Sequence, residues 1–263
     1  MAVKSLRETL LAARAAKTSA FVPFVMAGDP DMATSADILL ALQESGAAAI
    51  ELGVPFSDPV ADGETVQRAA ERALAGGATL GRVMDMLRTA RGRGLSIPVC
   101  LFSYLNPVFH MGYATFAKAA QAAGAQGALI VDLPPEAAGD YLTAMKAAGM
   151  ETVFLCSPTT TPERLARIDA ASSGFVYYVS REGVTGAQAS LPESLDSKLA
   201  ALRAQLQSPL AVGFGISTPA HVAALSGKAD AVIVGSALVK TIAEHGKTAP
   251  TAIARQVKDL RAA

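Results

Sequence analysis

The chain has 263 residues, of which 51% are hydrophobic, and its 23 basic and 23 acidic side chains balance to a formal net charge of +0. The balance argues against nucleic acid or an anionic membrane as the main partner, and the apolar content disfavours disorder. No apolar stretch is long enough to span a bilayer, and residues 1–20 lack the apolar centre of a signal peptide. We therefore expect a reducing, cytoplasmic location, where Cys100 and Cys156 are buried thiols within apolar runs.

One pattern recurs along the chain: an Ala/Leu-rich helical segment, a glycine and a short run rich in Val, Ile and Leu. The short runs are apolar throughout, which is typical of parallel strands that are covered on both faces. The intervening glycines suit the left-handed position that ends a helix: Gly46, Gly94, Gly124, Gly149 and Gly227. The pattern predicts strands at 20–26, 48–53, 97–103, 127–131, 151–156, 175–179, 209–213 and 230–234.

Repeated strand–helix units in a chain of this length predict an α/β fold, a closed (β/α)8 TIM barrel that forms a single domain over 1–263. We expect residues 1–16 to form an extra amphipathic N-terminal helix that closes the bottom of the barrel. A doubly wound open sheet is the alternative, but the sequence after the first strand, GDPDMATSADI, lacks the expected GxGxxG. The polar, glycine-rich segment 180–193 is a candidate lid, and we expect it to be mobile without ligand.

Glu51 ends the second predicted strand among Ala, Ile, Leu, Gly and Val residues. The active site of a TIM barrel lies at the carboxyl ends of its strands. Burial of a carboxyl group there raises its pKa toward the working pH, which suits a general acid or base. The alternative is a structural glutamate that is paired with a neighbouring cation or hydroxyl.

Small residues follow the last three predicted strands, in the motifs GVTGA (183–187), GFGIS (213–217) and VGSA (234–237). Backbone N–H groups at a helix start bind phosphate, and the last two strands of a barrel are a common place for it. A glycine at a strand end is also ordinary turn chemistry, so each motif alone is weak. Together they favour a phosphorylated ligand.

The sequence lacks the residues that several reaction classes need. The lysines fall in helical or terminal segments, which disfavours a Schiff base, and no fingerprint of a redox cofactor is present. His110, His221 and His245 are scattered, so we expect no metal and no other cofactor. Acid–base chemistry on a phosphorylated substrate remains, with its apolar part against strand-end side chains that could equally be core: Phe24, Phe102, Tyr104, Leu129, Leu155 and Phe214.

The longest motifs of the chain resemble those of the tryptophan synthase α-subunit family. They are FVPFVMAGDP (21–30), ELGVPFSDPVADG (51–63), SYLNPVF (103–109), VDLPPEAA (131–138), YYVSREGVTGA (177–187), GFGIS (213–217) and VGSALVK (234–240). The resemblance covers nearly the whole chain. It implies a lyase of tryptophan biosynthesis that cleaves indole-3-glycerol phosphate to indole and glyceraldehyde 3-phosphate by a retro-aldol step, without a cofactor.

The resemblance also implies site residues. Glu51 would move the proton at indole C3 and help to deprotonate the glycerol hydroxyl, Asp62 would accept the indole N–H, and Tyr177 would lie near the scissile bond. The residues implied to contact the indole ring are Phe24, Phe102, Leu129, Leu155 and Phe214. Thr185 lies in the implied mobile loop and would bond Asp62 when that loop closes. The implied phosphate contacts are Gly186, Gly215, Gly235 and Ser236.

A tryptophan synthase β subunit is the implied partner, in an α2β2 heterotetramer, with the loop around Asp58 as part of the docking surface. A stand-alone lyase that releases free indole shares the same motifs and stays an alternative. A non-catalytic regulatory subunit is a second alternative, against which the intact Glu51, Asp62 and Tyr177 speak. Another phosphate-binding barrel would use different strand-end residues.

Overall fold

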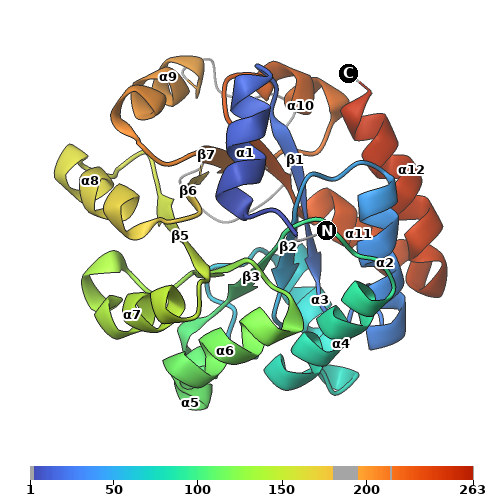
Figure 1. Cartoon of the computed structure of the whole chain (residues 1–263). Coiled ribbons are helices and arrows are strands. Elements are labelled where there is room, and N and C mark those ends of the chain that lie inside the picture. Colours follow the sequence, from blue (N-terminus) through green and yellow to red (C-terminus); the bar gives the residue numbers. More distant parts are fainter. Residues whose placement is uncertain (1–2, 180–194, 214, 263) are drawn as a thin grey trace.

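The computed structural model describes residues 3–179, 195–213 and 215–262, and within them eight parallel strands form a closed barrel (Figure 1). The strands are β1 (Ala20–Met26), β2 (Ile50–Gly53), β3 (Val99–Ser103), β4 (Gly127–Ile130), β5 (Glu151–Cys156), β6 (Phe175–Val179), β7 (Leu210–Gly213) and β8 (Ala231–Val234). Each strand pairs with the next, and β8 pairs with β1 through Ala20 and Ala231. This closure confirms the TIM barrel and rules out the doubly wound open sheet.

Helices surround the barrel as an outer ring (Figure 1). The described helices are α1 (Leu6–Ala15), α2 (Met32–Glu44), α3 (Glu64–Ala75), α4 (Leu80–Gly92), α5 (Leu105–Met111), α6 (Tyr113–Ala123), α7 (Gly139–Ala147), α8 (Pro162–Ala171), α9 (Leu195–Gln205), α10 (Pro219–Leu225), α11 (Ser236–His245) and α12 (Ala249–Arg261), with 3-10 turns η1 (Pro135–Ala137) and η2 (Gly246–Thr248). None of them is long and apolar enough to cross a membrane.

Local sequence signals set the helix ends. Side chains accept hydrogen bonds from first-turn N–H groups at several starts, as Asp31 does for α2 and Thr161 does for α8. The glycines that the sequence placed after helices all have φ between 67° and 104°, namely Gly46, Gly94, Gly124, Gly149 and Gly227. The left-handed backbone that these positions need is therefore available without a side-chain clash.

Alternate residues of each strand face two separate apolar layers. One layer fills the barrel and includes Phe24, Phe102 and Tyr177. The other lies between the barrel and the helices. Because both faces of each strand are covered, the strands read as continuous apolar runs. Cys100 and Cys156 are free and buried in these layers, which confirms the expectation of buried thiols.

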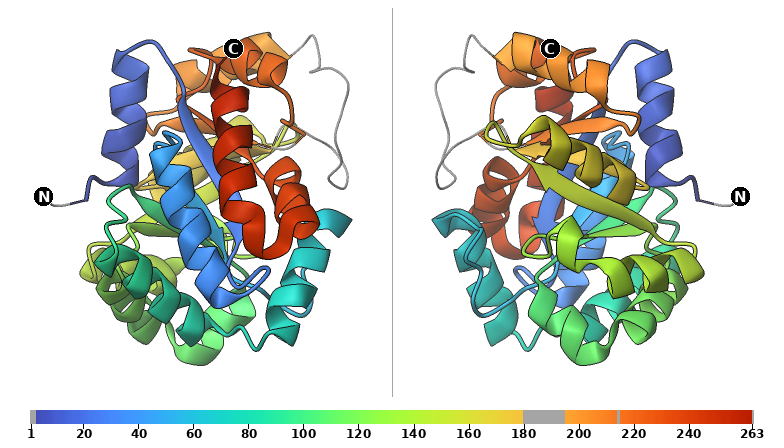
Figure 2. Two further views of the ribbon diagram at one scale, coloured as in Figure 1. Left: turned by 90° about the vertical axis from the view of Figure 1, so that its right-hand side faces the viewer. Right: turned by 90° about the vertical axis from the view of Figure 1, so that its left-hand side faces the viewer.

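Helix α1 lies across one end of the barrel, as the sequence predicted (Figures 1 and 2). Leu6 and Leu10 are 1% and 0% exposed and belong to the layer that fills the barrel. The carboxylate of Glu151, at the start of β5, accepts hydrogen bonds from Leu6 N–H at 2.6 Å and Arg7 N–H at 3.1 Å. These contacts close the end of the barrel that lies away from the carboxyl ends of the strands.

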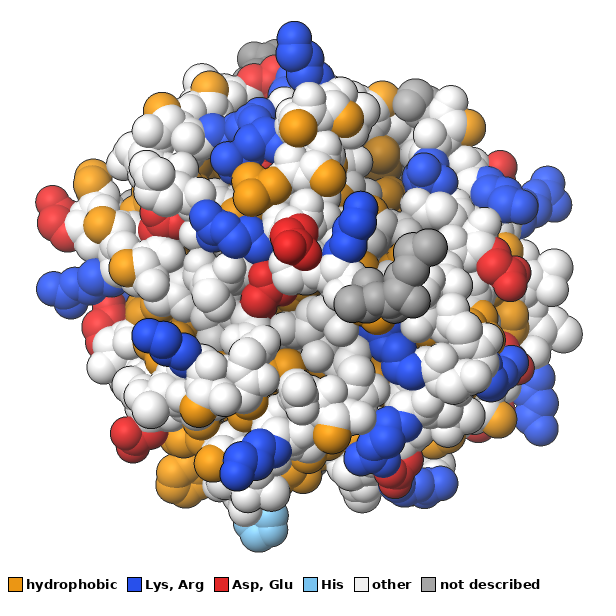
Figure 3. Space-filling model, in the orientation of Figure 1, with side chains coloured by type: hydrophobic (Ala, Val, Ile, Leu, Met, Phe, Trp, Pro, Cys, Tyr) orange, Lys and Arg blue, Asp and Glu red, His pale blue; other side chains and the backbone are white. Residues whose placement is uncertain are grey.

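Charged side chains are dispersed over the surface. On the face that carries α1, basic and acidic side chains are interspersed (Figure 3). The interspersion agrees with the net charge of +0.

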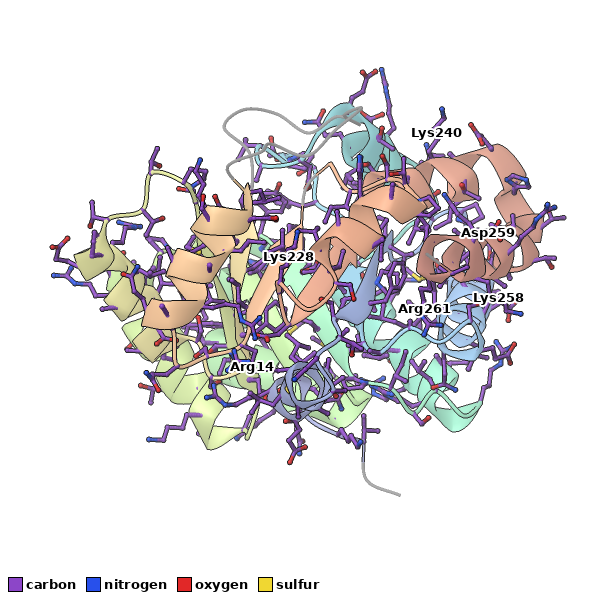
Figure 4. The ribbon with its side chains drawn as sticks, turned by 90° about the horizontal axis from the view of Figure 1, so that it is seen from above. Arg14, Lys228, Lys240, Lys258, Asp259 and Arg261 are labelled. Carbon is purple, nitrogen blue, oxygen red and sulfur yellow. The ribbon has the colours of Figure 1, made fainter. Side chains whose placement is uncertain are left out.

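A buried carboxylate fastens α1 to the barrel. The side chain of Asp230, directly before β8, is 0% exposed. It accepts hydrogen bonds from Arg14 Nε at 2.8 Å and from Leu210 N–H at 2.7 Å, and Arg203 adds a second cation at 3.3 Å. Figure 4 shows Arg14 on α1. Three segments that are distant in sequence thus meet on one carboxylate.

We predict that Asp230→Asn lowers the free energy of unfolding by about 2–4 kcal/mol, because it leaves partly buried guanidinium groups without their counter-charge. Urea unfolding at pH 7 measures the change. The matched control is Asp196→Asn, which breaks the exposed ion pair with Lys228 (Figure 4) and should cost less than about 1 kcal/mol. Equal losses in both variants would contradict the special role of Asp230.

Candidate active site

A pocket opens at the carboxyl ends of the strands. Its described lining is Phe24, Glu51, Asp62, Gly63, Val66, Phe102, Tyr177, Gly215, Ile216, Ile233, Gly235 and Ser236. The site residues expected from the sequence that meet in this pocket are Glu51, Asp62, Tyr177, Phe24, Phe102, Gly215, Gly235 and Ser236. Residues from β1, β2, β3, β6 and β8 and from the segments that follow β2, β7 and β8 therefore converge on one cavity.

Other expected residues lie elsewhere. Leu129 belongs to the layer that fills the barrel and Leu155 is partly buried against it, but neither is in the described lining of the pocket. Thr185, Gly186 and Phe214, together with the candidate lid 180–193, lie outside the described residues.

Glu51 is held by a central strand and is almost fully buried. Its position in β2 pairs with Phe24 of β1 and with Cys100 of β3. The residue is 2% exposed, and Oε1 has no hydrogen-bond partner among the residues that the structure describes. Burial, followed by the nearby charge of Asp62, raises the pKa of Glu51 to about 8. Glu51 is therefore a protonated carboxylic acid at pH 7.

Asp62 reaches the same pocket from the loop between β2 and α3. Its backbone N–H donates to the carbonyl oxygen of Pro59 at 3.0 Å, and Gln67 Nε2 donates to its carbonyl oxygen at 2.8 Å. The phenol of Tyr104 donates to Oδ2 at 3.0 Å. Burial raises the pKa of Asp62 to about 6, and the Tyr104 hydrogen bond opposes that rise. Asp62 is therefore mostly ionised at pH 7.

The two carboxyl groups thus hold opposite protonation states in one pocket. A neutral acid beside an ionised carboxylate is the arrangement by which a single site both donates a proton and stabilises positive charge. Burial raises the pKa of both groups, and the described lining contains no Lys or Arg to oppose it. The pKa values differ because the charge of Asp62 raises that of Glu51 further, whereas the Tyr104 hydrogen bond lowers that of Asp62.

Tyr177 lies on β6 with its ring 4% exposed. A Cβ atom at Gly213, on the neighbouring strand β7, would lie only 2.1 Å from the Tyr177 hydroxyl oxygen. Burial raises the pKa of Tyr177 well above its ordinary value, so the phenol stays neutral. The glycine therefore provides the space in which a neutral hydroxyl reaches the pocket.

The apolar wall of the pocket is built from two aromatic rings. Phe24 and Phe102 meet edge to face with their centroids 5.4 Å apart. A Cβ atom on Gly53 would lie 2.8 Å from Phe24 Cζ, so any side chain there would displace the ring. This wall suits a flat apolar ligand.

Another part of the pocket lining is rich in backbone groups. Gly235 and Ser236 line it at the start of α11, where the first N–H groups of a helix lack intrahelical acceptors. Such a helix start attracts an anion through these N–H groups and the helix dipole. Gly215, after β7, completes this part.

The sequence reasoning missed some contributors. Val66, Ile216 and Ile233 also line the pocket, and Tyr104 was expected as part of an apolar floor. Its hydroxyl instead holds Asp62. The position of Tyr104 at a strand end was the available signal, but the contact depends on the path of the loop 54–63.

The described residues contain no group of three or more His, Cys, Asp or Glu side chains that could hold a metal ion. The polar groups of the described pocket lining are two carboxyls, one phenol, one serine and backbone.

Residues 10–262 match the family model for the tryptophan synthase alpha chain. A tryptophan synthase alpha chain from Pelobacter propionicus is 46% identical over 94% of this chain and 92% of that protein. The corresponding protein from Burkholderia thailandensis is 44% identical over 97% of this chain and 93% of its own length.

Solved structures give the same result. A chain of the tryptophan synthase a2b2 complex from Pyrococcus furiosus superposes with a TM-score of 0.87 at 41% identity, over 93% of this chain and 98% of that one. A tryptophan synthase alpha chain from Legionella pneumophila superposes with a TM-score of 0.88 at 36% identity, over 98% of this chain and 95% of that one.

We predict that Glu51→Gln stabilises the chain at high pH. The folded-state pKa of about 8 lies above the ordinary 4.5, so wild-type stability falls as the pH rises through this window. The variant avoids this loss. It should be more stable than wild type by about 2 kcal/mol or more at pH 9 and nearly equal to it below pH 5.

Urea unfolding from pH 5 to pH 9 measures the effect, and Glu44→Gln, at an exposed position, controls for the change in net charge. A Glu51→Gln variant that is less stable than wild type at pH 9 would contradict the burial of an uncompensated carboxyl group.

Proposed function

The chain belongs to the tryptophan synthase alpha chain family, and we propose that Glu51 and Asp62 divide the proton transfer and charge stabilisation of its reaction between them. The chain is a carbon–carbon lyase of tryptophan biosynthesis that cleaves indole-3-glycerol phosphate to indole and glyceraldehyde 3-phosphate. One observation carries the assignment of roles: two carboxyl groups line one pocket. Glu51 is 2% exposed and its Oε1 has no hydrogen-bond partner among the described residues, whereas the Asp62 carboxylate accepts a hydrogen bond from Tyr104.

The first step is protonation of the indole ring. Glu51, neutral at pH 7, gives its proton to indole C3, and the pyrrole ring loses its aromaticity and gains positive charge. Asp62, ionised at pH 7, accepts a hydrogen bond from the indole N–H and stabilises that charge. The apolar wall around the carboxylate strengthens this interaction, because little water screens it.

The second step breaks the carbon–carbon bond. The carboxylate left on Glu51 takes the proton of the hydroxyl on the carbon bonded to C3. The bonding electrons return to the ring, which restores the aromatic indole, and the hydroxyl carbon becomes the aldehyde of glyceraldehyde 3-phosphate. Glu51 ends protonated, so the cycle closes without a net change in protons and without an external acid or base.

The rest of the pocket would orient the substrate between these groups. The indole ring would lie against Phe24 and Phe102, and the phosphate would bind the N–H groups at Gly235 and Ser236. The neutral phenol of Tyr177 would contact the glycerol chain near the scissile bond. Holding both ends of the substrate fixes C3 beside Glu51, which lowers the entropic cost of the reaction.

A tryptophan synthase β subunit is the partner of the chain. The P. furiosus relative is part of an a2b2 complex, and we propose the same α2β2 assembly here. The loop between β2 and α3 would dock on β, because Val60 at its tip is 81% exposed and Asp58 is also exposed. That loop carries Asp62, so docking and catalysis would share one segment.

We further propose that the whole chain is a single barrel domain and that it acts in the cytoplasm. The pairing of β8 with β1 supports the first point. Two free, buried cysteines and a biosynthetic role support the second.

We predict that Glu51→Gln lowers indole release by at least about 100-fold, the usual contribution of a general acid. Asp62→Asn should lower it by about 100-fold or more, because it removes the charge that stabilises the protonated ring. Glu151→Gln is the matched control: it changes a partly buried carboxyl at the other end of the barrel and should keep activity within about twofold of wild type.

Indole release from indole-3-glycerol phosphate is measured with and without a β subunit. Weak activity that rises on adding β supports the assembly, whereas full activity alone would identify a stand-alone lyase. A wild-type chain that is inactive in both cases but stimulates β would be a regulatory subunit, and retained activity in Glu51→Gln would refute the assigned roles.

The pH dependence follows from the same pair. The active form has Asp62 ionised and Glu51 protonated, so kcat/KM should be bell-shaped and fall below about pH 6 and above about pH 8. Steady-state assays from pH 5 to pH 9 test this. A profile that keeps rising above pH 8 would show that Glu51 acts first as a base and would contradict the proposed order of steps.

A further inference from the structure

Tyr104 lies directly after β3, and its buried ring touches the loop that carries Asp62. The residue is 2% exposed, and its ring packs on Phe56 of that loop with centroids 5.2 Å apart. The phenol makes two hydrogen bonds to the loop. It donates to Asp62 Oδ2 at 3.0 Å and accepts from Ala61 N–H at 3.0 Å.

The other contacts of the loop fix its backbone and leave the carboxylate free to turn. Gln67 Nε2 donates to the carbonyl oxygens of Asp62 and Pro59 at 2.8 Å and 3.4 Å. Within the described parts of the chain, the Tyr104 hydroxyl is the hydrogen-bond partner of the Asp62 carboxylate. Burial does not hold the tip in place either, because Val60 and Ala61 are exposed.

We propose that Tyr104 is a positioning residue for the reaction: its hydroxyl orients the Asp62 carboxylate in the pocket and favours the ionised form of that group. This inference rests on the charge-stabilising role proposed for Asp62. The inference depends on the hydroxyl acting both as a donor and as an acceptor. Because the oxygen accepts from Ala61, its proton is directed to Asp62, and one phenol sets both the path of the loop and the aim of its carboxylate.

The charged and titratable groups around Asp62 give the sign of the effect. Glu51 on β2 and Tyr177 on β6 interact with it electrostatically, and both are neutral at pH 7. Asp132, after β4, faces Tyr104 and accepts from Leu105 N–H at 2.7 Å. None of these groups donates a hydrogen bond to the Asp62 carboxylate within the described residues. Loss of the Tyr104 donor should therefore raise the pKa of Asp62.

The test is Tyr104→Phe, which keeps the ring and its packing on Phe56 and removes only the hydroxyl. The acid limb of the kcat/KM profile should move up by about one pH unit, since a hydrogen bond to a charged group is worth roughly that much. The matched control is Tyr141→Phe, which removes a buried phenol that donates to the carbonyl oxygen of Ala128, outside the pocket. It should leave the acid limb in place.

A second variant reverses the sign. Replacement of Tyr104 by 3-fluorotyrosine makes the phenol a stronger donor, so the acid limb should move down. This substitution keeps both hydrogen bonds, and it remains informative if Tyr104→Phe folds poorly.

Combining Tyr104→Phe with Asp62→Asn separates the inference about Tyr104 from the proposed role of Asp62. If Asp62→Asn is impaired and Tyr104→Phe causes no further loss in that background, the hydroxyl acts through Asp62. If Asp62→Asn is impaired but neither Tyr104 variant moves the acid limb, the positioning role is wrong and the proposed function stands. If Asp62→Asn keeps wild-type activity, the role of Asp62 itself is wrong, and the inference about Tyr104 is overturned with it.

Discussion

The site depends on one constraint: ionisation of a carboxyl group that is enclosed by apolar side chains has a high free-energy cost. Glu51 lies in the barrel wall beside Phe24 and Cys100, is 2% exposed and has no cation near it in the described pocket lining, so it stays protonated at neutral pH. A proton donor of this kind needs no metal and no lysine. It does need a partner that stays charged close by, and Asp62 meets this need from a less buried loop.

Residues on strands and residues on the loop between β2 and α3 have different roles. Glu51, Phe24, Phe102 and Tyr177 stand on strands, where neighbouring strands fix their backbone. Asp62 stands on a loop whose tip is exposed, so its geometry can respond to whatever binds that tip. Tyr104 joins the two parts, since it belongs to the end of a strand and bonds the loop. A partner subunit on the loop could then adjust the charge-stabilising group without disturbing the proton donor.

The sequence predicted those features of the fold and the site that depend on local chemistry. Continuous apolar runs gave the eight strands, although β2 and β3 begin two residues later than expected, at Ile50 and Val99. The apolar neighbours of Glu51 gave its burial. The contact between Tyr104 and Asp62 could not be predicted, because it joins residues 42 positions apart through an irregular loop. Leu129 and Leu155 were expected at the indole site from their strand-end positions and from the resemblance. They are not part of the described pocket lining, because a strand-end position does not show at which height the cavity ends.

The central claim is that Glu51 is protonated and Asp62 ionised in the same pocket at pH 7. Infrared difference spectroscopy of the wild-type chain against Glu51→Gln and Asp62→Asn, with the pH varied from 5 to 9, measures both states directly. We expect a carboxylic acid band at pH 7 that is absent from Glu51→Gln and disappears from wild type above about pH 8, and a carboxylate band that is absent from Asp62→Asn. A carboxylate signal from Glu51 at pH 7 would contradict it.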